Sequence, residues 1–354
     1  MSQNKTYFDF VNITKLILAI SIVAMHCGLV PERSWLMTFV CRLGVPYFFV
    51  ASGFFFERKL RRDTPKNAVK LYIKRLLLPY SVFSVVWILQ MLIDNALGHV
   101  GVWETVLRLA QSILFYPRGE LGYVWASIIG VLMLYPFLKR KKLLLALPIG
   151  LALFAAGLLA NNYYFAAAKS PWLKTAVDAY LKVCLVSNNG PFVGFVFLLI
   201  GMLISERYDW IVEHVNLVVS LIVLILSCVC LFFEDSFLQG QANSIGDGAF
   251  YLSQLIYVPA VFCLTTRIPC PHLSKTISTT AKNLSTGIYF LHVPLLWIIH
   301  RAATYLLPRV PGLGKLAPLF DHAAVCFPCC LFLCLAICLL AYRRPKSFLC
   351  KILK

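Results

Sequence analysis

The sequence has 354 residues, of which 60% are hydrophobic and only 14% are charged. An average soluble domain carries about 25% charged residues, whereas the mean hydropathy of this chain is +0.78. These values exclude an ordinary cytosolic enzyme, a disordered chain and a secreted disulfide scaffold. They indicate a polytopic membrane protein of the all-α class.

The charges and cysteines are placed as expected for such a protein. The 33 Lys and Arg exceed the 15 Asp and Glu, for a net charge of +18, but they lie mostly between apolar runs. Because this placement encodes membrane topology, we expect no nucleic-acid partner. Most of the 13 cysteines lie inside apolar segments and are expected to be small buried hydrophobes rather than disulfides or metal ligands.

Long apolar segments follow one another along the whole chain. A spanning helix needs about 20 apolar residues, and this window identifies residues 8–30, 35–56, 78–97, 122–138, 143–160, 190–205, 215–233, 250–266, 283–304 and 322–342. We therefore predict a bundle of about ten transmembrane helices in a single domain, residues 1–354. We expect no signal peptide, because the first apolar run lacks a small-residue cleavage pattern.

The basic residues predict the orientation of these helices. With a cytosolic N-terminus, 22 Lys and Arg lie in inner segments and nine in outer ones. The inner set includes the basic residues of segments 57–76, 139–142 and 343–354. Since cytosolic loops are enriched in Lys and Arg, this distribution predicts that both termini are cytosolic.

Two outer connections, residues 98–121 and 161–189, are longer than turns. In the second, apolar side chains recur at helical spacing: Trp172, Leu173, Ala176, Val177, Tyr180, Leu181 and Cys184. Polar side chains face the other way: Lys174, Asp178 and Lys182. This pattern predicts a helix in the membrane interface, with a solvated amphipathic loop as the alternative.

Four ionisable residues lie inside predicted spans: Lys15, His26, Arg42 and His292. Placing a charged side chain at the centre of a membrane helix costs roughly 2.5–3.5 kcal/mol on insertion scales, so each of these residues needs a partner or a function. Lys15 and His26 are eleven residues apart, which places them on nearly one helix face about 16 Å apart. The alternatives are that Lys15 extends to the inner interface and that a carbonyl or hydroxyl group satisfies His26.

The other two residues lie in distinctive contexts. Arg42 opens a stretch, residues 42–53, in which Pro46 frees a carbonyl group. Arg42 stays protonated, so it requires an anionic or carbonyl-rich partner, unless its role is to hold helix ends together. His292 shares a helix face with Tyr289, and Pro294 loosens the backbone beside its imidazole.

Five blocks of sequence resemble the acyltransferase-3 family of integral membrane proteins. They are Asn12 to Lys15 with Met25-His26, Cys41 to Phe54, Lys74-Arg75 with Pro79-Tyr80, Asn188 to Gly201, and Leu284 to His292. The chain departs from the family pattern at Asn12, where an acid is common, at Lys15, where Arg is common, and at Tyr123, where His is frequent. Lysine keeps the charge of arginine but lacks its bidentate fork.

The resemblance implies an O-acyltransferase of the bacterial cytoplasmic membrane. The donor would be cytosolic acyl-CoA, usually acetyl-CoA, and the acceptor a hydroxyl group of an extracytoplasmic carbohydrate or glycolipid, as in polysaccharide O-acetylation. The implied partners are therefore this donor, the acceptor and membrane lipid. No metal is implied.

The expected site combines a base, anion-stabilising groups and a phosphate-binding cluster. An imidazole titrates near neutral pH, so His26 is the expected general base, with Arg42 and His292 as the other catalytic residues. Lys15, Lys74 and Arg75 are expected to bind the CoA phosphates. One alternative is a transporter for an anionic solute. Another is a transport or substrate-binding module of the kind attached to racemases in resistance proteins that resemble this family.

Overall fold

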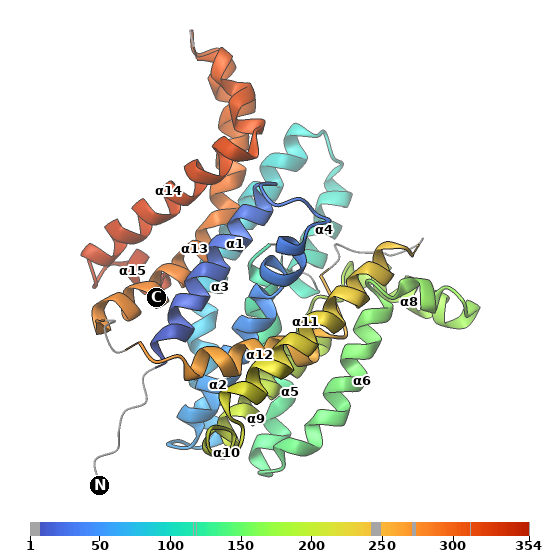
Figure 1. The fold of residues 1–354 in the computed structure, drawn as a ribbon. Helices are drawn as coiled ribbons and strands as arrows, with labels where there is room; N and C mark the ends of the chain where they lie inside the picture. Colours follow the sequence, from blue (N-terminus) through green and yellow to red (C-terminus); the bar gives the residue numbers. More distant parts are fainter. Residues whose placement is uncertain are drawn as a thin grey trace. The chain divides into compact units, whose positions relative to one another are not determined.

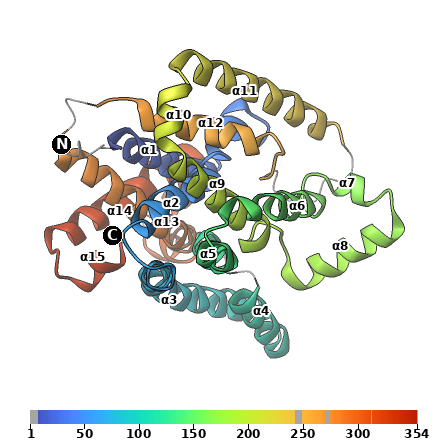
Figure 2. The same cartoon turned by 90° about the horizontal axis from the view of Figure 1, so that it is seen from below.

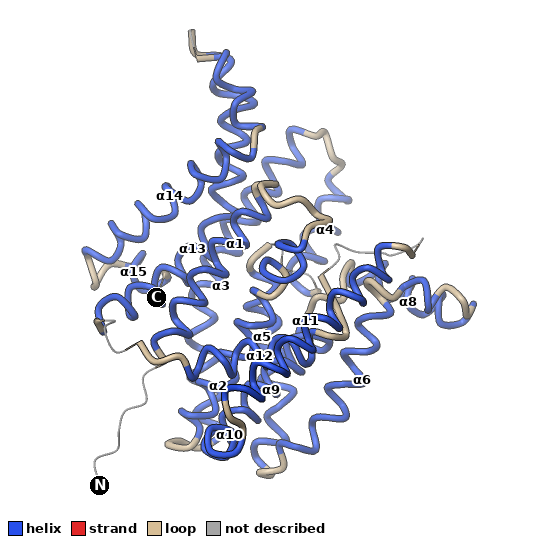
Figure 3. The backbone as a smooth tube through the Cα atoms, viewed as in Figure 1, coloured by secondary structure: helices blue, strands red, loops and turns tan. Residues whose placement is uncertain are grey.

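The computed structural model describes residues 8–115, 117, 119–241, 249–270, 274–311 and 313–353. Within these ranges it contains helices and their connections and no β-strand, which confirms the all-α class (Figure 3). The chain divides into two compact units. The terminal unit comprises Met1–Gly44 and Thr265–Lys354, and the central unit comprises Val45–Leu264.

The terminal unit is built on three long helices, α1 (Asp9–His26), α13 (Lys275–Arg301) and α14 (Ala323–Arg343). Shorter elements complete it: the π-helices η1 (Met37–Cys41) and η4 (Ala302–Leu306), the 3₁₀-helices η5 (Leu307–Arg309) and η6 (Gly314–Asp321), and α15 (Phe348–Ile352).

The three long helices lie side by side in this unit (Figure 1). Helix α14 runs antiparallel to α13: Tyr342, near the end of α14, donates a 2.7 Å hydrogen bond to the carbonyl oxygen of Asn283, in the first part of α13. Gly287 permits the close approach, since a Cβ there would overlap the sulfur of Cys338. Four buried thiols, at positions 326, 330, 334 and 338, recur along α14. All 13 cysteines are free in the structure.

The central unit contains α2 (Gly44–Leu60), α3 (Pro65–Leu97), α4 (Val102–Leu114), α5 (Leu121–Lys139), η2 (Leu143–Leu145), α6 (Ala146–Leu159), α7 (Tyr164–Ala167), α8 (Pro171–Cys184), η3 (Gly190–Gly194), α9 (Phe195–Glu206), α10 (Tyr208–His214), α11 (Leu217–Gln239) and α12 (Gln254–Arg267). Figure 2 shows α3 beside α4 and α5. Helices α2 and α9 cross at two glycines. A Cβ on Gly53 would overlap the carbonyl oxygen of Leu198, and one on Gly201 would overlap that of Val50.

All ten predicted spans contain a helix, but not all of these helices are long enough to cross a membrane. Among the described residues seven qualify by length and composition, or eight if the pair Gly190–Glu206 and Tyr208–His214, bent by 67°, counts as one. The predicted segments 143–160 and 250–266 form the shorter helices Leu143–Leu159 and Gln254–Arg267. The second has 14 residues, about 21 Å at 1.5 Å per residue, against a hydrocarbon core of about 30 Å.

The predicted interfacial segment contains α8, and its faces are largely those expected. Val177 is buried against Tyr164, while Lys174 forms a 2.6 Å ion pair with Asp178 on the outside. Hydrogen bonds from Lys174 and Tyr164 lower the pKa of Asp178 below its ordinary value. Trp172 is 74% exposed.

Candidate active site

The candidate site in the terminal unit is formed by α1 and α13, which run parallel. Near their starts, the amide of Asn12 donates to the Ser278 hydroxyl at 2.9 Å. Fourteen residues further along each helix, the rings of His26 and His292 lie 5.3 Å apart, centroid to centroid, at an angle of 39°. Constant register over about 21 Å brings together two histidines that are far apart in sequence.

His292 is the buried member of the pair, with 1% of its surface exposed. Its Nδ1 atom lies 3.1 Å from the carbonyl oxygen of Ile288 and 2.8 Å from that of Tyr289. Because a carbonyl oxygen only accepts hydrogen bonds, Nδ1 carries the proton and Nε2 holds the lone pair of the neutral ring. Nε2 is buried and makes no hydrogen bond within the described residues. The backbone therefore fixes a ring whose free nitrogen can accept a proton.

His26 is the exposed member and the last residue of α1. The helix ends there because Gly28 adopts a left-handed conformation, with φ of 72°. The amide of Gly28 bonds the carbonyl oxygen of Met25, and the amide of Leu29 bonds that of Ala24. This is the Schellman pattern that closes a helix with glycine. His26 thus stands at a defined helix end, in front of the buried ring.

Arg42 lies between η1 and α2, inside the apolar segment Met37–Leu60, as predicted. It is half-buried. Its neighbour Cys41 donates to the carbonyl oxygen of Ser21, and Gly44 packs against the side chain of Ile22. These contacts attach the segment around Arg42 to the helical turn of α1 that precedes His26.

The predicted phosphate-binding residues are distributed over both units. Lys15 is half-buried on α1, in the terminal unit with the histidine pair. Lys74 and Arg75 are exposed on α3, in the central unit. The structure therefore brings together His26 and His292, and it places Lys15 about 16 Å along the same helix from His26.

The central unit contains a group of hydroxyl side chains that the sequence did not identify as one cluster. The hydroxyls of Ser52 and Tyr123 lie 2.8 Å apart, and Tyr72 interacts with Ser52 and Ser127. Arg75 lies near enough to act electrostatically on both tyrosines. Neutral hydroxyl side chains are tolerated in apolar helices, so the search for charged residues inside the predicted spans did not identify this cluster.

No group of three or more His, Cys, Asp or Glu side chains in the part of the chain that the structure describes is arranged to hold a metal ion. The imidazoles of the histidine pair can accept and donate protons.

One family model matches this chain over most of its length. The model of the acyltransferase-3 family, described as an acyltransferase domain, matches residues 8–344. The match extends over both units and nearly the whole chain, so this chain belongs to the acyltransferase-3 family.

The curated relatives that match this chain are longer than it. The chain is 26% identical over 290 residues to a serine/alanine racemase of Enterococcus gallinarum, covering 78% of this chain and 39% of that protein. It is 22% identical over 307 residues to an amino-acid racemase of Enterococcus faecalis, covering 84% and 42% respectively. The chain spans less than half the length of either relative. No solved structure gives a significant match.

Proposed function

We propose that this member of the acyltransferase-3 family transfers an acyl group, in the simplest case acetyl, from cytosolic acyl-CoA to a hydroxyl group of an extracytoplasmic or lipid-linked carbohydrate. The observation that carries the proposal is the histidine pair, 5.3 Å apart, with a buried nitrogen available as a proton acceptor. Its setting is the bacterial cytoplasmic membrane.

In the proposed reaction, the oxygen of the acceptor hydroxyl attacks the thioester carbonyl carbon and its proton passes to His26. The tetrahedral intermediate then collapses, the carbon–sulfur bond breaks, and His26 passes the proton that it took up to the CoA sulfur. The products are an ester and free CoA. His292 orients the acceptor, and its Nε2 accepts a hydrogen bond from protonated His26, so that the two rings share the positive charge. Arg42 stabilises the developing oxyanion.

The donor requires a second group of residues to bind its phosphates. Lys15, Lys74 and Arg75 are proposed to hold the CoA phosphates by charge-assisted hydrogen bonds. With Lys15 about 16 Å from His26 along α1, the donor must bind in an extended conformation to present its thioester to the base.

The test compares His26→Ala with the wild-type protein in reconstituted membranes supplied with radiolabelled acetyl-CoA. Removal of a positioned base commonly lowers the rate 10²–10⁴-fold, and CoA binding should persist because the phosphate-binding residues are unchanged. Lys15→Ala should have the opposite effect, with weaker CoA binding that is less sensitive to salt. Normal turnover in both His26→Ala and His292→Ala would refute the acyltransferase proposal.

A second candidate function is suggested by the names of the relatives. A membrane segment shared with racemases can serve as a module that binds or transports an amino acid such as serine or alanine. This function predicts saturable serine binding by the purified chain and no release of CoA from acyl-CoA. Measuring both properties on one preparation distinguishes the two functions.

A further inference from the structure

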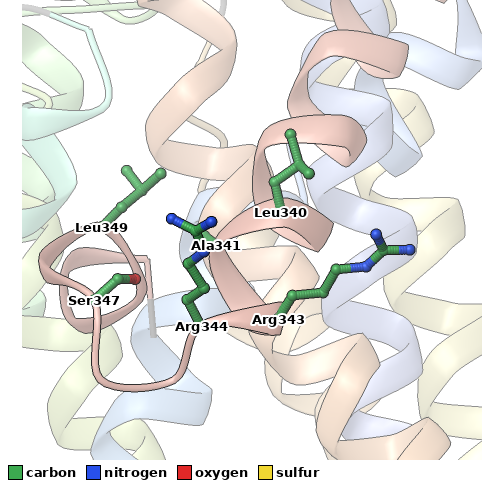
Figure 4. A pocket seen from close by; sticks show the side chains of 6 residues that line it. All are labelled: Leu340, Ala341, Arg343, Arg344, Ser347 and Leu349. Atoms are coloured by element: carbon green, nitrogen blue, oxygen red, sulfur yellow. The ribbon is translucent and has the colours of Figure 1, made fainter.

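A hollow of about 490 Å³ lies in the terminal unit, at the end of α14 (Figure 4). Its lining consists of Leu340, Ala341, Arg343, Arg344, Ser347 and Leu349. In Figure 4 the guanidinium group of Arg344 extends on the side of Ser347 and Leu349, and Arg343 extends away from them. The lining thus combines two fixed positive charges and a hydroxyl group with an apolar wall.

The hollow is held open by the way the chain turns after α14. The hydroxyl group of Tyr342 lies 3.0 Å from the carbonyl oxygen of Leu353 and so ties the end of α15 to α14. The Ser347 hydroxyl accepts a hydrogen bond from the amide of Cys350 and caps α15. Cys350 and Leu353 are fully buried. Because these contacts fix α15, the lining does not need to assemble around a ligand.

The two arginines of this hollow have no anionic partner among the residues that the structure describes. Neither arginine side chain forms an ion pair or hydrogen bond with the described residues. The sequence from His322 to its last residue contains no Asp or Glu, while Lys346 and Lys351 add further positive charge. The site therefore favours an anion.

The depth of the hollow selects the kind of anion. Helix α14 has 21 residues, most of them apolar. Its length of about 31 Å matches the thickness of the hydrocarbon core of a membrane. The arginines at its end therefore lie at the level of lipid headgroups. Beside them Leu340, Phe348 and Leu349 are 61%, 62% and 41% exposed. A ligand with a phosphate at headgroup depth and apolar chains along these side chains is an anionic phospholipid.

We propose that this hollow binds one anionic phospholipid of the leaflet that faces the chain termini. Its phosphate lies between Arg344 and the Ser347 hydroxyl, Arg343 supplies a second positive charge at the same level, and an acyl chain follows Leu340 and Leu349. The proposal concerns lipid binding and does not depend on acyl transfer.

The test titrates the purified full chain in neutral detergent with dioctanoyl phosphatidylglycerol, and with dioctanoyl phosphatidylcholine as the uncharged comparison. The variant is Arg343→Gln with Arg344→Gln. The matched control, Lys346→Gln with Lys351→Gln, makes the same change in charge on exposed residues outside the lining. Thermal melting and gel filtration establish that both variants are folded.

The arginine variant should bind phosphatidylglycerol roughly thirtyfold more weakly, since each basic residue near an anionic membrane contributes about a fivefold factor. The lysine control should stay within about twofold of the wild type. Equal losses in the two variants would overturn the proposal, because they would indicate diffuse charge rather than a site. Displacement of the lipid by CoA at equal potency would also overturn it and assign the arginines to the donor.

Discussion

The two histidines differ in the contacts that hold their rings, and substitutions can test the role of each ring nitrogen of His292 separately. His292 is fixed through Nδ1 by the carbonyl oxygens of Ile288 and Tyr289, so its proposed role rests on Nε2. Asparagine at this position keeps an N–H donor near the Nδ1 position and removes Nε2. His292→Asn therefore separates structural support from proton transfer.

We expect His292→Asn to reach the membrane and melt within a few degrees of the wild type, and to lose about 10²-fold or more in turnover. His292→Ala should lose both activity and stability, because it leaves a buried cavity and removes the hydrogen bond. Acyl-transfer rates and thermal melting in detergent measure the two effects. Wild-type turnover in His292→Asn would mean that the ring serves packing alone.

A second prediction at the residue scale concerns Glu120, which directly precedes α5 and is 3% exposed. Burial raises its pKa from 4.5 to about 8, although the Trp87 side chain partly counteracts this shift. A carboxyl group whose folded pKa is raised contributes stability below its unfolded pKa and loses it as the pH rises through the folded value. The stability of the protein should therefore fall between about pH 4.5 and pH 8.

Glu120→Gln should remove this loss, because glutamine stays neutral across the window. Melting curves in detergent at several pH values provide the measurement, and the expected difference from the wild type grows to several degrees on the alkaline side. Glu104→Gln is the control, since Glu104 is exposed and paired with Arg108. A wild-type slope in Glu120→Gln would assign the pH dependence to other groups.

At the scale of elements, the crossing of α2 and α9 depends on Gly53 and Gly201. A Cβ on Gly201 would overlap the carbonyl oxygen of Val50, and a backbone atom cannot move aside as a flexible side chain does. Gly201→Ala should therefore destabilise the fold by about 1–3 kcal/mol, the usual cost of overpacking. Gly122→Ala on α5 is the matched control, because its new Cβ would meet only Pro117, at an ordinary 3.5 Å. Equal melting temperatures for the two variants would contradict close contact at this crossing.

Element boundaries show where sequence reasoning succeeded and where it did not. Hydropathy located a helix in each of the ten predicted segments, because the apolar composition of a segment does not depend on how it packs against other segments. It placed the start of the third helix at residue 78, whereas α3 begins at Pro65. Thr64 caps that helix by accepting a hydrogen bond from the amide of Asn67, a polar signal that a hydropathy window omits.

At the scale of the whole molecule, the sequence identified His26 and His292 one at a time, because ionisable residues inside predicted spans are costly. Only the tertiary structure shows that the two rings meet. Their contact depends on the register between α1 and α13, which Asn12 and Ser278 help to set. A hydropathy pattern contains no information about register between distant helices. The distribution of Lys15, Lys74 and Arg75 over two compact units is unreadable from sequence for the same reason.

The last prediction concerns topology. Helices α1 and α13 run parallel and α14 runs antiparallel to α13, so Asp9, Lys275 and Arg343 lie at one end of the terminal unit. With 22 of the basic residues in the inner segments, this end should face the cytosol. Reporters fused within residues 57–76, at residues 139–142 and after residue 350 should give cytosolic signals. A reporter within residues 307–311 should give an extracytoplasmic one. An extracytoplasmic signal at any of the first three positions would reverse the orientation and, with it, the proposed direction of acyl transfer.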